Sequence, residues 1–198
     1  MTDIELRIRI TQLLAEVPAT AWDACASTDT VIAESAKLIH EDNSPLRLPT
    51  RGQLNNPFVS HAFLSSLERS GSVGGRSGWQ PRHLLAEDAQ GGLMGAAPCY
   101  VKTHSRGEYV FDHGWAEAFE RAGGDYYPKL QVAVPFTPVT GPRLLARPGP
   151  QAEAVRGALG DALAEITSAS ELSSAHVTFL LETEWHVLGQ RGFLQRTD

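Results

Sequence analysis

Between Leu93 and Arg143 the chain carries side chains that can exchange protons and that stand close together. Two imidazoles, two carboxylates and a phenol occur in one short stretch, at His104, Glu108, Tyr109, Asp112 and His113. An imidazole within reach of a carboxylate suits the deprotonation of an amine near neutral pH. We therefore take His104, Tyr109 and Asp112 as candidate catalytic residues. The alternative is a structural polar corner, and no HxH or HxxxH spacing supports a metal site.

A second polar group lies on two segments that have the alternation of strands. Side chains on a strand point to opposite faces in turn, and in both segments one face is apolar and the other polar. The polar side chains of these segments are Tyr100, Lys102, Tyr127, Lys129 and Gln131. They predict either a substrate-binding groove or a solvated outer face of a sheet.

The residues after the second strand combine two hydroxyl groups, a glycine and a guanidinium. Thr137, Thr140, Gly141 and Arg143 have the types that bind phosphate, although the same residues also suit a turn braced by proline. A helix is expected to begin near Gln151, and its free N-H groups favour an anion.

Composition limits the class of protein. The chain has 198 residues, 42% of them hydrophobic, which is enough for one domain with a buried core. A formal net charge of -6 argues against a partner that is nucleic acid or an anionic membrane. Cys25 and Cys99 lack metal-type spacing and fit core thiols in a reducing compartment. No apolar run approaches the roughly 20 residues of a membrane span, so we expect a cytoplasmic protein without membrane insertion.

The hydrophobic periodicity predicts a mixed α/β fold in one domain over residues 1–198, with a twisted sheet and helices on both faces. Residues 27–55 have the weakest pattern and predict a surface excursion. The expected strands are 4–10, a hairpin from 83–88 to 93–104, 126–136, 176–181 and a last one after Gly192. The expected helices follow residue 10, begin at Asn56 and stop at Ser70-Gly71, and lie within 108–122, 151–168 and 182–190.

This order of elements resembles the GNAT superfamily of acyl-CoA-dependent N-acyltransferases. The segment 189–193, GQRGF, is similar to the GF ending of the last helix in many members. Three further segments, NPFVSHAFLSSLERSGS, HSRGEYVFDHGWAEAFERAGGDYYPKLQ and VPFTPVTGPRLL, look like the N-terminal part of a bacterial group of GNAT-like proteins. That group is described as peptidoglycan biosynthesis or recognition proteins, distant relatives of the Fem-type aminoacyl transferases.

The resemblance implies a site for acetyl-CoA or another acyl-CoA as co-substrate. The strand 129–136 would pair its backbone with the pantetheine arm, and residues 137–143 would approach the pyrophosphate. The cofactor-binding residues implied in this way are Val134, Phe136, Thr137, Val139, Thr140, Gly141 and Arg143. Backbone N-H groups at the end of the strand would polarise the carbonyl of the donor.

Three departures from the superfamily pattern support a different class of function. Pro142 follows Gly141 where the superfamily has a glycine-repeated turn, and proline has no N-H to donate to phosphate. Leu188 stands where many members hold a tyrosine general acid. Proteins of the group are also usually longer, with a second GNAT-like half.

We therefore carry two hypotheses. The first is a GNAT-like acyltransferase that moves an acyl or aminoacyl group to an amine of a small molecule or cell-wall precursor. The second is a non-catalytic GNAT-like half that recognises a peptidoglycan precursor or a partner domain, with a second half or a homodimer as partner. A sheet that opens beside residues 134–136 favours the first hypothesis, because a donor arm needs that space, and a packed sheet favours the second.

Overall fold

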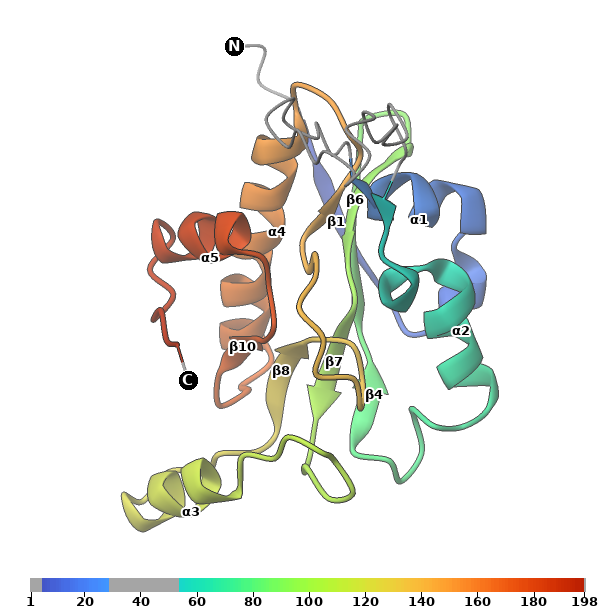
Figure 1. Cartoon of the computed structure of the whole chain (residues 1–198). Coiled ribbons are helices and arrows are strands. Elements are labelled where there is room, and N and C mark those ends of the chain that lie inside the picture. Colours follow the sequence, from blue (N-terminus) through green and yellow to red (C-terminus); the bar gives the residue numbers. More distant parts are fainter. Residues whose placement is uncertain (1–4, 29–53, 198) are drawn as a thin grey trace, which may run out of the picture.

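A computed structural model describes residues 5–28 and 54–197 of the chain (Figure 1). Most of the predicted surface excursion over residues 27–55 lies outside the described residues. The described part contains sheets with helices packed on both sides, so the prediction of a mixed α/β fold is confirmed.

The first sheet has the strand order β1-β5-β6-β9, and every neighbouring pair is antiparallel. Its strands are β1 (Arg7–Thr11), β5 (His83–Glu87), β6 (Leu93–Ala97) and β9 (Leu145–Ala146). The predicted hairpin joins β5 to β6. Its turn is held by Asp88, whose Oδ1 accepts hydrogen bonds from the backbone N-H groups of Gln90 at 3.0 Å and Gly92 at 2.7 Å.

The second sheet has the order β10-β8-β7-β4, in which only β10 and β8 are parallel. Its strands are β4 (Trp79–Pro81), β7 (Cys99–Lys102), β8 (Lys129–Val132) and β10 (Ala175–Val177). Strand β4 continues into β5 through Arg82, and β6 continues into β7 through Pro98. The two sheets are therefore successive parts of one long hairpin, interrupted where Pro98 has no N-H to donate. Separately, β2 (Ser27–Thr28) pairs with β3 (Leu54–Asn55).

Helices cover both faces of the first sheet (Figure 1). Helices α1 (Ala19–Ala26) and α2 (His61–Arg69) lie on one face, with the short 3-10 helices Leu14–Glu16 and Pro57–Val59 beside them. Helix α4 (Ala152–Ala169) lies on the other face, and α5 (Glu182–Gly189) packs against α4. Each face has its own buried apolar cluster.

The contact between α4 and β6 is close because Gly95 has no side chain. A Cβ atom at Gly95 would collide with the side chain of Val155 and the carbonyl oxygen of Leu145. Val155, Leu159 and Leu163 are buried along α4, which confirms the apolar stripe predicted for this helix.

The helix expected to begin at Asn56 is divided in two. Asn56 accepts a hydrogen bond from Phe58 N at 3.0 Å, but this cap begins only a 3-10 turn. Ser60 then caps α2 by accepting from Phe63 N at 3.3 Å. The predicted stop is confirmed, because α2 ends at Arg69 and Gly71 follows with a φ of 73°.

Two predicted strands are shorter than expected or absent. The strand expected over 126–136 is limited to β8, because Pro128 and Pro135 flank it and cannot donate to a ladder. The last strand expected after Gly192 is not formed, since residues 193–197 lie outside any helix or strand.

The connection from β7 to β8 projects away from the sheets and contains α3 (His113–Arg121) (Figure 1). We call residues 103–125 the arm. Within α3 only Ala116 is buried and Trp115 is half exposed, and Phe111, just before the helix, is also exposed. The arm therefore adds little to the apolar core, and its polar contacts with the second sheet hold it in place.

Candidate functional site

The pairing of β7 with β8 places two lysines opposite each other. Lys102 is the register partner of Lys129, and the two residues are only 4% and 2% exposed. Like charges directly opposite on neighbouring strands are destabilising, and a buried ammonium group needs a partner. This sheet therefore requires two acids from elsewhere in the chain.

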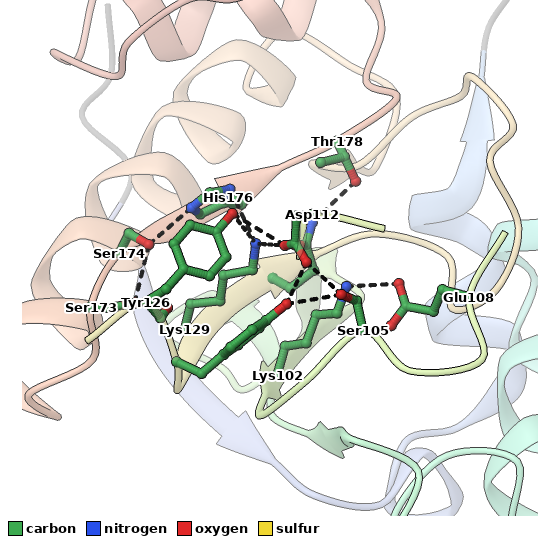
Figure 2. A network of polar contacts seen from close by, with 12 residues as sticks. Lys102, Ser105, Glu108, Asp112, Tyr126, Lys129, Ser173, Ser174, His176 and Thr178 are labelled. Atoms are coloured by element: carbon green, nitrogen blue, oxygen red, sulfur yellow. Dashed lines mark hydrogen bonds and ion pairs between the residues drawn. The ribbon is translucent and has the colours of Figure 1, made fainter. Parts of the chain in front are cut away.

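The arm supplies both acids (Figure 2). Glu108 Oε2 lies 2.7 Å from Lys102 Nζ, and Asp112 Oδ2 lies 2.5 Å from Lys129 Nζ. Around these ion pairs lie hydroxyl groups and an imidazole. We call the whole set the polar cluster: Lys102, Ser105, Glu108, Asp112, Tyr126, Tyr127, Lys129 and His176.

Asp112 is the centre of the polar cluster. Its carboxylate accepts hydrogen bonds from Ser105 Oγ at 2.6 Å, from Tyr126 OH at 3.2 Å, from Tyr127 OH and from Lys129. Asp112 stands at the N-cap of α3 but makes no capping bond, because its carboxylate is engaged in the cluster. Burial alone would raise the pKa of Asp112, but the bonds from Lys129, Ser105 and Tyr127 outweigh it and hold the pKa well below 3.8.

His176 joins the cluster from β10. Its Nδ1 lies 3.5 Å from Lys129 Nζ, and its Nε2 lies 2.9 Å from Ser174 Oγ. Burial and the neighbouring Lys129 charge lower the pKa of His176 to about 4. The imidazole is therefore neutral near pH 7. Burial also lowers the pKa of Lys129, an effect that Asp112 opposes.

The polar side chains of β7 and β8 are buried in the protein, so this face of the sheet is not a solvated outer face. Gln131 is buried, and its Nε2 donates to Thr178 Oγ1 at 3.1 Å. Tyr100 is fully buried between the rings of Trp79 and His83, with centroid distances of 5.4 and 5.1 Å. Tyr127 lies in the polar cluster, while Tyr100 lies beside it. Substrate binding by these residues stays a prediction.

The acid-base set predicted from residues 104–113 is divided by the structure. Glu108 and Asp112 point into the polar cluster. Tyr109 is 85% exposed, and His113 is exposed at the start of α3. His104 lies outside the cluster, where its ring covers Gly78. The three candidate catalytic residues His104, Tyr109 and Asp112 are thus not brought to one point.

His104 instead lines an open cleft with a volume of about 510 Å³. The residues around the cleft come from three segments and are Arg76, Ser77, His104, Arg106, Gly107 and Phe136. The segments meet because Thr103 N donates to Gly78 O at 3.0 Å and the His104 ring packs on Gly78. The cleft brings together two predicted site residues, His104 and Phe136.

Phe136 has an unusual backbone. Its φ is 59°, a value that residues other than glycine rarely adopt, and its ring is half exposed at a centroid distance of 5.9 Å from the Trp79 ring. Backbone strain of this kind tends to persist where function requires it.

The strands β8 and β10 part after Val132 and Thr178, whose last shared bond is Thr178 N to Val132 O at 3.2 Å. The chain itself fills the opening. Gly141 N donates to Phe179 O at 2.9 Å, and Arg143 Nε donates to Thr178 O at 2.9 Å. Residues 139–143 therefore lie alongside the continuation of β10.

Arg143, predicted to bind pyrophosphate, is fully buried. Its guanidinium donates to the main-chain oxygens of Val139 at 2.6 Å, Pro142 at 3.1 Å and Thr178 at 2.9 Å. Burial lowers its pKa to about 10, an effect that Glu184 opposes. These contacts give Arg143 a structural role in joining the loop to the end of β10.

Glu184, on α5, also binds the loop that contains Arg143. Its carboxylate accepts backbone N-H bonds from Arg143 at 2.8 and 3.0 Å, from Leu144 at 2.6 Å and from Leu181 at 3.2 Å. Burial raises the pKa of Glu184, and the three N-H donors oppose the rise.

The other residues implied for donor binding are spread over this loop. Val134 is buried in the cluster beneath α1 and α2. Thr137 Oγ1 donates to Pro135 O at 3.1 Å, and Val139 and Thr140 are exposed. The residues that the resemblance implied for binding the acyl donor therefore do not line a single surface.

Sequence reasoning missed His176, Ser105 and Tyr126 as members of the cluster. It also missed Arg76 and Arg106 at the cleft. A signal existed for His176, which begins a predicted strand, but its place beside Lys129 depends on the parallel pairing of β10 with β8.

Among residues 5–28 and 54–197, no three His, Cys, Asp or Glu side chains are grouped so that they could hold a metal ion. In the same part of the chain, no helix combines the length and apolar character needed to cross a membrane.

The FemAB-like family, described as peptidoglycan biosynthesis/recognition, matches residues 13–198. Because the match spans nearly the whole chain, the protein belongs to this family. Comparison with the curated proteins and with the solved structures gave no match.

Proposed function

We propose that this chain recognises a peptidoglycan precursor and does not transfer an acyl group from acyl-CoA. The observation that carries the proposal is the filled opening between β8 and β10. A pantetheine arm paired with the end of β8 needs that space, but residues 139–143 and the Arg143 side chain occupy it. These contacts support a chain that has no site for an acyl-CoA donor beside β8.

Two features support a binding role at the cleft and the adjoining polar cluster. Buried ionisable groups with shifted pKa values, here Asp112, Lys129 and His176, are commoner at functional sites than elsewhere. Phe136 offers a half-exposed ring on a strained backbone at the open cleft.

The test is binding of a muropeptide, a sugar-peptide fragment of peptidoglycan, followed by tryptophan fluorescence, since Trp79 packs on Phe136. We expect Phe136→Ala to weaken binding about tenfold. Phe179→Ala is the matched control, because Phe136 and Phe179 are 39% and 37% exposed and have φ values of 59° and 55°. Equal binding by the two variants, or no binding by the unmodified chain, contradicts the proposal.

One observation favours a second function, acyl or aminoacyl transfer from an ester donor that does not use the space beside β8. The neutral His176 lies beside Lys129 and Tyr126, where its imidazole can hold an attacking amine by a hydrogen bond. The amine nitrogen would bond to the ester carbonyl carbon, the ester C-O bond would break, and the alcohol would leave with a proton.

Mass spectrometry of the muropeptide after incubation with an aminoacyl ester tests this second function. A mass gain that is lost in His176→Gln and kept in His186→Gln, an exposed histidine of α5, supports transfer. An unchanged muropeptide mass excludes it for that donor.

A further inference from the structure

The cleft beside Phe136 concentrates positive charge in a protein whose formal net charge is -6. Arg76 comes from the loop before β4, and Arg106 from the loop after β7. Among residues 5–28 and 54–197, neither guanidinium takes part in an ion pair. Two exposed cationic side chains that line one cleft, with no ion-pair partner among the described residues, favour an anion.

The other groups that line the cleft indicate which class of anion it would bind. Ser77 offers a hydroxyl group. The backbone N-H of Arg106 donates to His104 Nδ1 at 3.3 Å, which leaves the Arg106 guanidinium outside this bond. Phe136 adds a half-exposed ring on which a flat or apolar part of a ligand can lie. Two guanidiniums and a hydroxyl group match the three oxygens of a phosphate ester better than the two oxygens of a carboxylate.

One acidic residue lies near the cleft. Glu108 follows Gly107, a residue of the cleft. Its Oε2 lies 2.7 Å from Lys102 Nζ, so its charge is offset within the polar cluster.

We infer that this cleft binds a phosphate ester, with Arg76 and Arg106 on the phosphate and Phe136 against the organic group. The inference deepens the proposed function and rests on it for the biological source of the ligand, the phosphorylated part of a precursor. The binding chemistry itself depends only on the cleft.

Titration of the whole chain with phenyl phosphate tests the inference, with benzoate and inorganic phosphate in parallel. We expect saturable binding of phenyl phosphate, at least several-fold tighter than binding of either comparison compound. The double variant Arg76→Ala, Arg106→Ala should bind at least tenfold more weakly. The control is Arg121→Ala, Arg147→Ala, which removes the same charge from exposed positions outside the cleft and should bind as the unmodified chain does.

Phe136→Ala should bind phenyl phosphate and inorganic phosphate equally well, because it loses the surface for the ring. A second experiment measures binding of the chain to vesicles that contain phosphatidic acid. Binding of the soluble ester alone identifies a soluble ligand, and binding of the vesicles through the same two arginines identifies a lipid-linked one.

The inference is overturned if neither phenyl phosphate nor the vesicles bind saturably. It is also overturned if both double variants bind phenyl phosphate more weakly by the same factor. The muropeptide carries no phosphate, so the two proposals fail separately. Muropeptide binding without phosphate binding removes only the phosphate site, whereas phosphate binding without muropeptide binding removes only the proposed recognition of the peptide part.

Discussion

The carboxylate of Asp112 lies 2.5 Å from the ammonium group of Lys129, and this ion pair joins the arm to the second sheet. Lys129 is almost fully buried beside Lys102, so the arm neutralises charges that the sheet cannot hold alone. The polar cluster therefore anchors the arm to the second sheet, next to the residues that line the cleft.

The first prediction concerns this pair. Asp112→Asn should lower the free energy of unfolding by about 3 kcal/mol, because it leaves the Lys129 charge buried and unpaired. The added change Lys129→Met should recover part of the loss. Urea denaturation measures both, with Asp125→Asn, an exposed residue of the arm, as the control. A loss for Asp112→Asn no larger than that of the control would show that the pair does not hold the arm.

The second prediction is a pH dependence of stability set by His176. The pKa of His176 is lowered to about 4 in the folded chain, from 6.5, so the unfolded chain binds its proton more readily between these values. Stability from this group is present above pH 6.5 and is lost as the pH falls toward 4. Asp112, whose pKa is also lowered, adds a further loss below about pH 4.

Denaturation at several pH values checks this prediction by comparing the unmodified chain with His176→Gln. The difference in unfolding free energy between them should change between pH 4 and 6.5 and stay constant above pH 7. A constant difference over the whole range would mean that His176 is not held neutral by its surroundings.

The third prediction concerns the joint between the loop 139–143 and α5. Glu184→Gln should cost about 2–3 kcal/mol, because an amide NH2 group would face backbone donors that a carboxylate now accepts. Glu182→Gln is the matched control on the same helix, with a side chain that is 88% exposed. Thermal and urea unfolding should separate the two variants clearly; similar stabilities would remove Glu184 as a structural partner of Arg143.

The fourth prediction tests the wall of the cleft. A Cβ atom at Gly78 would lie 2.6 Å from the His104 ring, whereas one at Gly75 would meet nothing within 4 Å. Both glycines have positive φ, at 82° and 52°, so both Ala variants carry backbone strain. Only Gly78→Ala should also weaken binding of phenyl phosphate, by about fivefold or more, since it displaces His104. Equal affinities of the two variants for phenyl phosphate would show that the position of His104 does not affect binding at the cleft.

Much of this arrangement can be predicted from local patterns. The period of two placed Lys102, Lys129 and Gln131 on one polar face, and the apolar stripe of α4 and the β5-β6 hairpin followed from periodicity and turn residues. These features depend on residues close together in the chain, which a sequence displays directly.

What the sequence could not predict are the contacts between distant segments. The burial of the two lysines depends on Glu108 and Asp112 folding back from the arm, and the role of His176 depends on β10 lying beside β8. Arg143 has the residue type of a phosphate ligand, but its surroundings are set by Val139, Thr178 and Glu184. The cleft likewise exists only because three loops meet.

Parallel isothermal titrations of the purified chain with a muropeptide and with acetyl-CoA test the central claim most directly. The account predicts saturable heat with the muropeptide, reduced in Phe136→Ala but not in Phe179→Ala, and no saturable heat with acetyl-CoA. Saturable binding of acetyl-CoA, with none of the muropeptide, would contradict it, because the chain would then have to open the space beside β8 that residues 139–143 now fill.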